Sequence, residues 1–308
     1  MSSLRRTATI AAILVIAVAS LAPPMSGAMH TGPARASTAP LGEFRKRVAL
    51  RHVRRLAGGI GVRVRATRGE RRGQRYVAGR LRALGYRVFV QRFSVDAGTS
   101  RNVIARWPGA RRYPVVVGGH VDTVAGSPGA NDNASGIGTM LEVARLVAGR
   151  PQARWVVFAS FGSEEYGSDG VHHVGSQVFV NRLGAKGRRR LAAMLSVDMV
   201  GRTVGGRAHI VGTAGIGPPA AARTVLRKAR RAGVRVAYRT TCDCSDNGPF
   251  ERAGIPAAFL WSGSEPNYHS PRDRFRNVRP KSVGRAGRIV RAFVSALDRR
   301  LVTRLRRS

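Results

Sequence analysis

Three short apolar segments in the middle of the chain each lead into a side chain that can carry charge. They are Val115–Gly118, Trp155–Phe161 and Met194–Val197, and a helical apolar period over Ala134–Val147 separates the first two. Short continuous apolar runs that alternate with helices are typical of a largely parallel sheet covered on both faces. We therefore expect an α/β fold.

The remaining apolar patterns extend this arrangement. Further strands are expected at Arg87–Val95, Asn102–Trp107, His209–Val211, Val234–Tyr238 and Ala257–Trp261, and further helices at Glu70–Leu84, Pro219–Ala232 and Lys281–Leu301. An earlier helical period that begins at Glu43 is expected to end at Gly58. Because no interior linker follows, residues 41–308 are expected to form one domain, a single α/β/α sandwich around a mostly parallel central mixed sheet.

Residues 1–28 have the pattern of a secretory signal peptide. A basic pair, Arg5 and Arg6, precedes an apolar run from Ile10 to Leu21, and small residues lead up to Ala28. This run is shorter than the roughly 20 residues that span a bilayer. We expect cleavage, a linker over residues 29–40, no membrane span in the mature protein, and a secreted, extracellular or cell-wall location.

The chain is strongly basic, with 54 Lys and Arg against 16 Asp and Glu and a formal net charge of +38. Such a balance would ordinarily suggest nucleic acid or an anionic surface as a partner. Nearly all of the charge is arginine spread along the chain, which a compositional bias of the source genome explains equally well. We expect no specific nucleic acid partner, and only nonspecific adhesion to anionic cell-surface polymers.

Because carboxylates are scarce, those that gather are informative. Asp122, Asp132, Glu164, Glu165 and Asp198 lie in one central stretch, close to the ends of the expected strands. Ligands of open α/β sheets bind at the C-terminal ends of the strands. These acids are therefore candidates for a functional site.

Two imidazoles, His120 at a strand end and His269 in a polar loop, complete the set. Taken alone, each position has an ordinary explanation; Asp132 or the asparagine after it, for example, could simply cap a helix. Together, three of these carboxylates, those of Asp132, Glu165 and Asp198, and the two imidazoles suit two divalent zinc ions with one carboxylate bridging. A metal also explains the adjacent acids Glu164 and Glu165, because it can bind one and leave the other free for proton transfer.

The only two cysteines, Cys242 and Cys244, are one residue apart. A bridge across a single residue is strained, so a tight local disulfide and two free thiols both remain open. A zinc site built on these cysteines would need further ligands nearby.

These segments resemble the secreted bacterial two-zinc aminopeptidases, in a superfamily that also holds glutamate carboxypeptidase, glutaminyl cyclase and the transferrin-receptor ectodomain. The resemblance covers most of the mature chain and implies the zinc-exopeptidase fold. It rests on the motifs Gly-His-Val-Asp, Asn-Asp-Asn-Ala-Ser-Gly, Gly-Ser-Glu-Glu, Val-Asp-Met-Val-Gly, Ser-Asp-Asn-Gly-Pro-Phe and Tyr-His-Ser-Pro.

The resemblance implies a metal-binding role for five residues. Asp132 would bridge two zinc ions. His120 and Asp198 would complete one zinc site. Glu165 and His269 would complete the other.

It also implies roles for three residues that do not bind metal. Glu164 would be the general base, taking a proton from a water that bridges the two zinc ions and delivering it to the leaving amine. Tyr268 would polarise the scissile carbonyl or hold the oxyanion. Asp122 would orient His120.

The chain departs from the family pattern at two places. The segment Tyr166–His173 is longer and more polar than the usual short turn, and we expect His172 and His173 to be solvated loop residues that could instead contact substrate. Ser245–Asn247 stands where relatives often carry Ser-Asp-His, so the role of that position stays open.

The leading interpretation is a metallo-aminopeptidase that hydrolyses the N-terminal bond of peptides with a free N-terminus. A zinc carboxypeptidase or dipeptidase would use the same metals. A glutaminyl cyclase resembles a single-zinc design and would leave His120 and Asp198 surplus. Outside catalysis, the alternatives are a noncatalytic module of the transferrin-receptor kind and a basic binding protein.

Overall fold

The computed structural model describes residues 41–308 apart from 113 and 206–207. The expected signal peptide and linker lie outside the described residues. Within the described part, no helix is both long enough and apolar enough to pass through a membrane.

The described residues contain an eight-stranded sheet in the order β1-β2-β4-β3-β5-β8-β6-β7. The strands are β1 Arg87–Val95, β2 Gly98–Arg106, β3 Val115–His120, β4 Val156–Phe161, β5 Ala193–Val197, β6 His209–Thr213, β7 Val236–Thr240 and β8 Ala257–Trp261. The central strands β4, β3, β5 and β8 run parallel. On either side of this centre, β2 lies antiparallel to β4 and β6 lies antiparallel to β8. The expected mostly parallel mixed sheet is confirmed.

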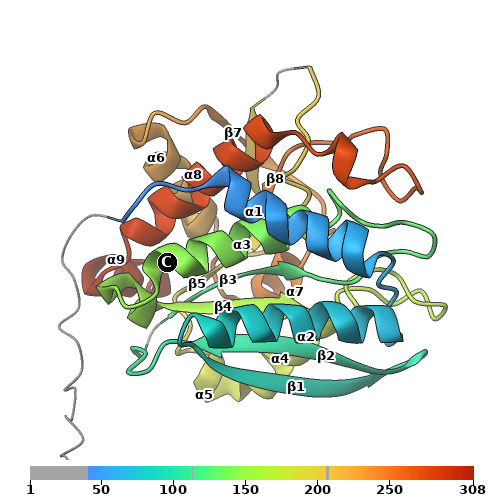
Figure 1. Ribbon diagram of the computed structural model, residues 1–308. Coiled ribbons are helices and arrows are strands. Elements are labelled where there is room, and N and C mark those ends of the chain that lie inside the picture. Colours follow the sequence, from blue (N-terminus) through green and yellow to red (C-terminus); the bar gives the residue numbers. More distant parts are fainter. Residues whose placement is uncertain (1–40, 113, 206–207) are drawn as a thin grey trace, which may run out of the picture. The chain divides into compact units, whose positions relative to one another are not determined.

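Helices cover both faces of this sheet (Figure 1). They are α1 Lys46–Val53, α2 Arg68–Ala83, α3 Ala134–Val147, α4 Val174–Arg182, α5 Gly184–Arg188, α6 Ala220–Arg231, α7 Asn247–Arg252, α8 Pro280–Ser295 and α9 Arg299–Arg306. Short helical turns add Arg54–Ile60, Pro151–Trp155 and Phe275–Asn277. Helices α1, α2, α3, α6 and α8 contribute side chains to one apolar core, and α4 and α7 contribute to the other.

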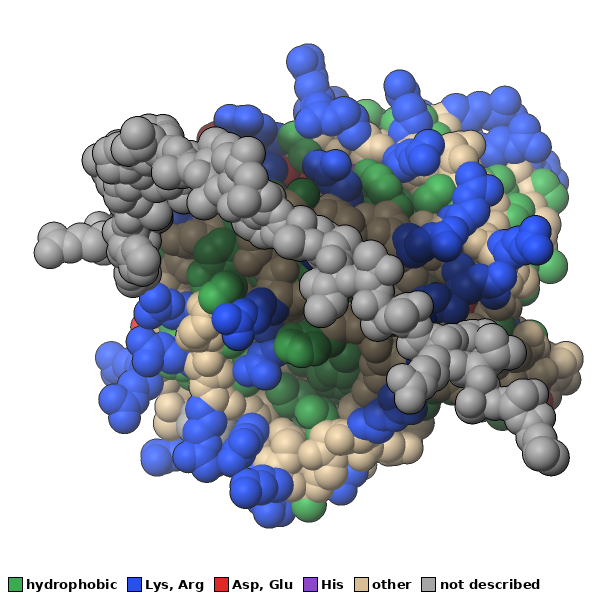
Figure 2. Space-filling view, turned by 60° about the horizontal axis from the view of Figure 1, so that its bottom comes forward, with side chains coloured by type: hydrophobic (Ala, Val, Ile, Leu, Met, Phe, Trp, Pro, Cys, Tyr) green, Lys and Arg blue, Asp and Glu red, His purple; other side chains and the backbone are tan. Residues whose placement is uncertain are grey.

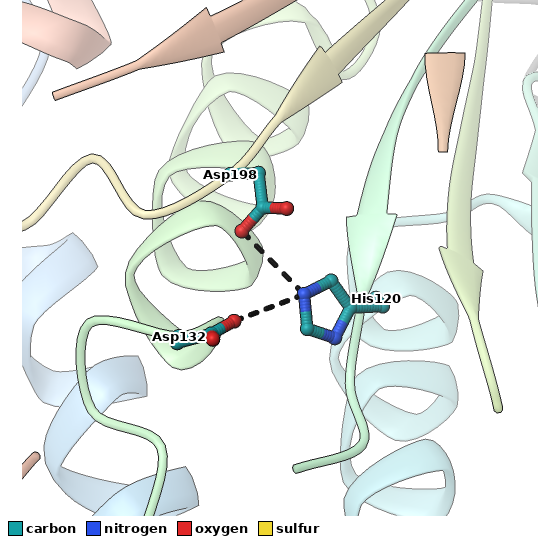
Figure 3. Close-up of side chains that lie close together, drawn as sticks. All are labelled: His120, Asp132 and Asp198. Atoms are coloured by element: carbon teal, nitrogen blue, oxygen red, sulfur yellow. Dashed lines mark ion pairs between the residues drawn. The ribbon is translucent and has the colours of Figure 1, made fainter. Parts of the chain in front are cut away.

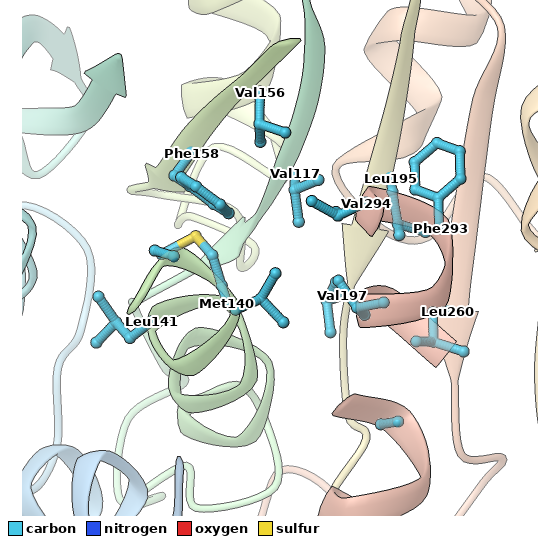
Figure 4. Packing of buried hydrophobic residues seen from close by; sticks show 14 of the residues in the cluster. Val117, Met140, Leu141, Val156, Phe158, Leu195, Val197, Leu260, Phe293 and Val294 are labelled. Atoms are coloured by element: carbon cyan, nitrogen blue, oxygen red, sulfur yellow. The ribbon is translucent and has the colours of Figure 1, made fainter. Parts of the chain in front are cut away.

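The two cores follow from the strict alternation of side chains along the central strands. In β3, Val115 and Val117 point into the larger core, whereas Val116 between them belongs to the smaller one. Figure 4 shows Val117 in the larger core with Met140 of α3 and residues of β4, β5, β8 and α8. Central strands that are buried on both faces explain why the sequence shows continuous apolar runs there.

Several helices differ from the sequence expectation. The first helical period runs through Gly58 to Ile60, and the expected closing helix is two helices, because Asp298 caps α9 by accepting a hydrogen bond from the Leu301 amide (2.7 Å). Helices α4, α5 and α7 were not expected. They are short, and few turns give little apolar period to detect.

On the face viewed in Figure 2, positive charge is distributed rather than gathered in one stripe. Figure 2 shows Lys and Arg side chains on all sides of the viewed face, with apolar side chains between them. This distribution agrees with the compositional explanation of the charge.

The topology places the candidate residues at one edge of the sheet. Because β4, β3, β5 and β8 are parallel, their C-terminal ends meet at the same edge. A side chain at Gly119 would meet the Val197 carbonyl oxygen at 2.6 Å and the amide nitrogen of Asn133 at 2.9 Å. A glycine there lets the ends of β3 and β5 and the start of α3 approach closely.

Candidate metal centre

The structure brings together all the side chains that the sequence predicted as metal ligands, together with the predicted base. His120 ends β3, the two adjacent glutamates follow β4, and Asp198 directly follows β5. Loops supply the rest: Asp132 lies before α3, and His269 lies in the segment after β8.

The potential ligands form two groups that share Asp132. His120 Nε2 lies 3.1 Å from Asp132 Oδ1 and 3.4 Å from Asp198 Oδ1 (Figure 3). His269 Nε2 lies 3.2 Å from Asp132 Oδ2 and 3.1 Å from Glu165 Oε2. Each carboxylate oxygen of Asp132 therefore faces a different group.

These groups fit divalent cations of the zinc type. Ligands about 2.0–2.2 Å from a tetrahedral zinc lie roughly 3.3 Å apart, close to the separations observed. Two buried carboxylate oxygens at the site, Asp198 Oδ1 and Glu165 Oε1, have no hydrogen-bond partner among the described residues. Buried carboxylates without such partners are costly unless a cation compensates them. A further grouping of His120 with both glutamates is also compact enough for one ion.

Burial dominates the electrostatics of the adjacent glutamates. It raises the pKa of Glu164 well above its usual value; Glu165 and Asp246 raise that pKa further, and His120 opposes them. Burial, then repulsion from Asp132, raises the pKa of Glu165 to about 7. In the protein alone these carboxylates therefore favour protonation, and bound cations would favour their charged forms.

Asp122 holds the backbone of both glutamates. Its two carboxylate oxygens accept hydrogen bonds from the amides of Glu164 (3.1 Å) and Glu165 (3.0 Å). His120 Nδ1 lies 3.7 Å from Asp122 Oδ1, beyond hydrogen-bond distance. In this structure Asp122 thus fixes the loop after β4 more directly than it fixes the His120 ring.

Replacing Asp122 with Asn should loosen both glutamates, because one of the two backbone amides would then face a donor instead of an acceptor. We expect zinc affinity or turnover to fall about 10–100-fold, and the free energy of unfolding to fall by about 1–3 kcal/mol. Zinc titration, peptide hydrolysis and chemical denaturation measure these effects. Asp298→Asn is a matched control, because Asp298 also accepts a hydrogen bond from a backbone amide, that of Leu301, and does not line the pocket; equal losses in both variants would contradict the role of Asp122.

Among the buried acids that the sequence did not reveal, Asp273 and Glu70 hold the backbone around the candidate ligands. Asp273 accepts hydrogen bonds from the amides of Asn131 (2.7 Å) and Asp132 (2.9 Å) and so fixes the bridging position. Glu70 of α2 accepts from the amide of Ser163 (2.9 Å), directly before the adjacent glutamates. The scarcity of acids was the available signal, since both lie in arginine-rich surroundings.

Asn133 has a larger role than the expected helix cap. Its Oδ1 accepts from the amide of Gly136 (2.9 Å), which confirms the cap at the start of α3. Its Nδ2 also donates to the Val197 carbonyl (3.0 Å) at the end of β5. This side chain therefore ties together the segments that carry Asp132 and Asp198.

The expectation that His173 is solvated is wrong. The residue is 2% exposed, and its Nε2 lies 3.0 Å from Glu164 Oε1. Burial, with His172 and Arg252 adding, lowers the pKa of His173 to about 3, so the ring is neutral and carries one N–H. His172 is half-buried and stacks on Tyr166.

A pocket of about 290 Å³ opens onto the candidate ligands. Its lining comprises His120, Asp132, Glu164, Glu165, Asp198, Met199, Cys242, Cys244, Phe259, Trp261, Ser264, Glu265 and Tyr268. The two cysteines are joined by a disulfide, which settles the pairing left open by the sequence. Tyr268 is half exposed and stacks on His269 at 3.7 Å between ring centroids.

Fold and site together define an α/β/α protein with a buried carboxylate and imidazole centre, suited to divalent cations, at the bottom of a small pocket. The chain belongs to Peptidase family M28, which residues 102–294 match.

Similar proteins agree with this membership. Leupeptin-inactivating enzyme 1 of Streptomyces exfoliatus is 31% identical over 85% of this chain and 59% of its own length. Aminopeptidase YwaD of Bacillus subtilis is 32% identical over 64% of this chain and 44% of its own. The chain spans about half the length of the curated relatives it matches.

Solved structures share the fold. A zinc aminopeptidase from Bacillus subtilis superposes with a TM-score of 0.75 at 20% identity, covering 82% of this chain and 94% of that one. Solved glutaminyl cyclases have the same fold.

Proposed function

We propose that the protein is a two-zinc aminopeptidase that hydrolyses the N-terminal bond of peptides, with Glu164 as the general base. The observation that carries the proposal is the bridging position of Asp132, whose two oxygens face two separate ligand groups beside a small pocket. The names of the similar aminopeptidases support it.

His120, Asp132 and Asp198 would hold one ion, and Asp132, Glu165 and His269 would hold the other. Bound zinc would supply Lewis acidity and lower the pKa of a coordinated water.

Glu164 is placed to move the proton. Its Oε2 lies 3.8 Å from His120 Nε2, at the edge of the ligand group, and its carboxylate lines the pocket. Because burial raises its pKa, this carboxylate can accept a proton from water and hold it until the amine leaves.

Tyr268 is placed to bind the substrate carbonyl. Burial, followed by repulsion from Asp132 and Glu165, raises the pKa of its hydroxyl, which therefore stays protonated. A neutral hydroxyl at the pocket lining can donate a hydrogen bond to a carbonyl oxygen as negative charge develops there.

The charge of the pocket favours an amine over a carboxylate as the recognised terminus. Its described lining contains no lysine or arginine, in a chain with 54 of them, whereas its acids are Asp132, Glu164, Glu165, Asp198 and Glu265. A carboxypeptidase needs a cation to hold the substrate carboxylate. The lining therefore favours the aminopeptidase over the carboxypeptidase alternative.

Zinc content and substrate terminus test the proposal together. We expect two zinc ions per chain, hydrolysis of free aminoacyl amides that chelation abolishes and zinc restores, and at least a 100-fold lower rate on N-acetylated substrates. Elemental analysis and a substrate panel measure both. Preference for N-acetylated peptides with a free carboxylate would instead identify a carboxypeptidase. One bound zinc ion together with cyclisation of N-terminal glutamine would identify a cyclase. A protein that binds no metal and turns over no substrate would be a binding protein.

A further inference from the structure

The loop between β4 and α4, which carries the adjacent glutamates, contains two left-handed residues that are not glycine. Ser163, directly before the glutamates, has φ +53°, and His173, directly before α4, has φ +55°. Left-handed conformations cost non-glycine residues roughly 1 kcal/mol or more, and they persist where the surrounding structure holds them. Such positions are concentrated at functional sites.

The start of α4 is hydrogen-bonded to the backbone of Ser163 and Glu164. The amide of His173 donates to the Glu164 carbonyl (2.8 Å), and the amide of Val174 donates to the Ser163 carbonyl (2.9 Å). The His173 ring reaches the same glutamate a second time, because its Nε2 lies 3.0 Å from Glu164 Oε1. Glu164 is thus held by His173 at both its main chain and its carboxylate.

The ring of His173 is itself confined. His172 packs against one side at 3.9 Å between ring centroids and stacks in turn on Tyr166. On the other side, His173 Nδ1 lies 3.9 Å from a carboxylate oxygen of Asp243, the residue between the two disulfide-bonded cysteines. Asp243 is paired with Arg252. The ring is therefore enclosed between two loops that border the pocket.

We propose that His173 is a positioning residue for Glu164, whose Oε1 it holds through its Nε2–H so that Oε2 stays turned towards the ligand groups. The proposal rests on the proposed function, since it assigns a partner to the general base. A carboxylate free to rotate about its side-chain bonds would spend part of its time away from the reacting water. A misplacement of about 1 Å can cost 100-fold in rate.

Kinetics of matched variants test the role. His173→Gly removes the ring and tolerates the left-handed backbone, and we expect kcat to fall about 10–100-fold with KM and zinc content unchanged. His173→Gln restores an N–H donor and should recover part of the loss. His52→Ala, which removes a half-buried ring that bonds to Tyr76 and does not line the pocket, should retain wild-type turnover. A loss of zinc, or an equal fall in His52→Ala, would overturn the proposal.

A double-mutant cycle separates positioning from general structure. In the Glu164→Gln background, His173→Gly should change the residual kcat less than threefold, because the base that it positions is already absent. A full 10–100-fold fall in that background would show that His173 acts through something other than Glu164.

Proton NMR of the nitrogen-15-labelled, zinc-loaded protein gives a readout that needs no turnover. We expect a slowly exchanging Nε2–H resonance of His173 that is present in His52→Ala and absent or shifted upfield in Glu164→Leu. Its absence from the wild-type protein, or its indifference to Glu164→Leu, would refute the contact. If the contact is present in a protein that hydrolyses no peptide, the proposed function fails, and so does the role of His173 as a partner of a general base.

Discussion

The Glu164→Gln protein is expected to bind as much zinc as the wild-type protein and to turn over peptides about 1,000-fold more slowly. The amide has nearly the shape of the carboxylate but cannot accept the proton of the attacking water. The base lies beside the ligands and not between the two groups that share Asp132, so the metals should be retained. Elemental analysis and steady-state kinetics measure the two effects.

A matched control guards against a general effect of losing a buried carboxylate. Glu142 of α3 is also buried, and its carboxylate pairs with Arg145 outside the pocket. Glu142→Gln should retain turnover. Full activity of Glu164→Gln would remove the base assignment, and loss of one zinc would instead show that Glu164 is a ligand, as its grouping with His120 and Glu165 allows.

Asp132→Ala should have the largest effect on metal binding, because it removes the carboxylate that two of the ligand groups found among the described residues share. We expect fewer than two tightly bound zinc ions and at least a 1,000-fold loss of turnover. Zinc should also stabilise this variant less: at a zinc concentration 100 times Kd, one site adds about 2.7 kcal/mol to the free energy of unfolding. Elemental analysis, together with thermal unfolding at several zinc concentrations, measures both changes.

The control here is Asp298→Ala, which removes a helix cap far along the chain. It should cost about 1 kcal/mol of stability and leave zinc binding unchanged. Two tightly bound zinc ions in the Asp132→Ala protein would refute the bridging role, whatever its activity.

The sequence by itself determined the fold class and the candidate ligands. Apolar runs such as Val115–Gly118 are readable because central parallel strands are buried on both faces. Residues at the C-terminal ends of such strands, among them His120 and Asp198, must meet at one edge because parallel strands end there together. Because carboxylates are scarce in this basic chain, Asp132 and Glu165 could also be recognised as candidate ligands.

Only the tertiary structure decided what surrounds and orients these ligands. Asp273 contacts the Asp132 amide from 141 positions away, and His173 reaches Glu164 through a left-handed turn. Neither contact has a local pattern, because each depends on the path of a loop and not on strand or helix period. The described pocket lining has no lysine or arginine although several separate segments supply it, so the proposed preference for an amine could be inferred only from the folded chain.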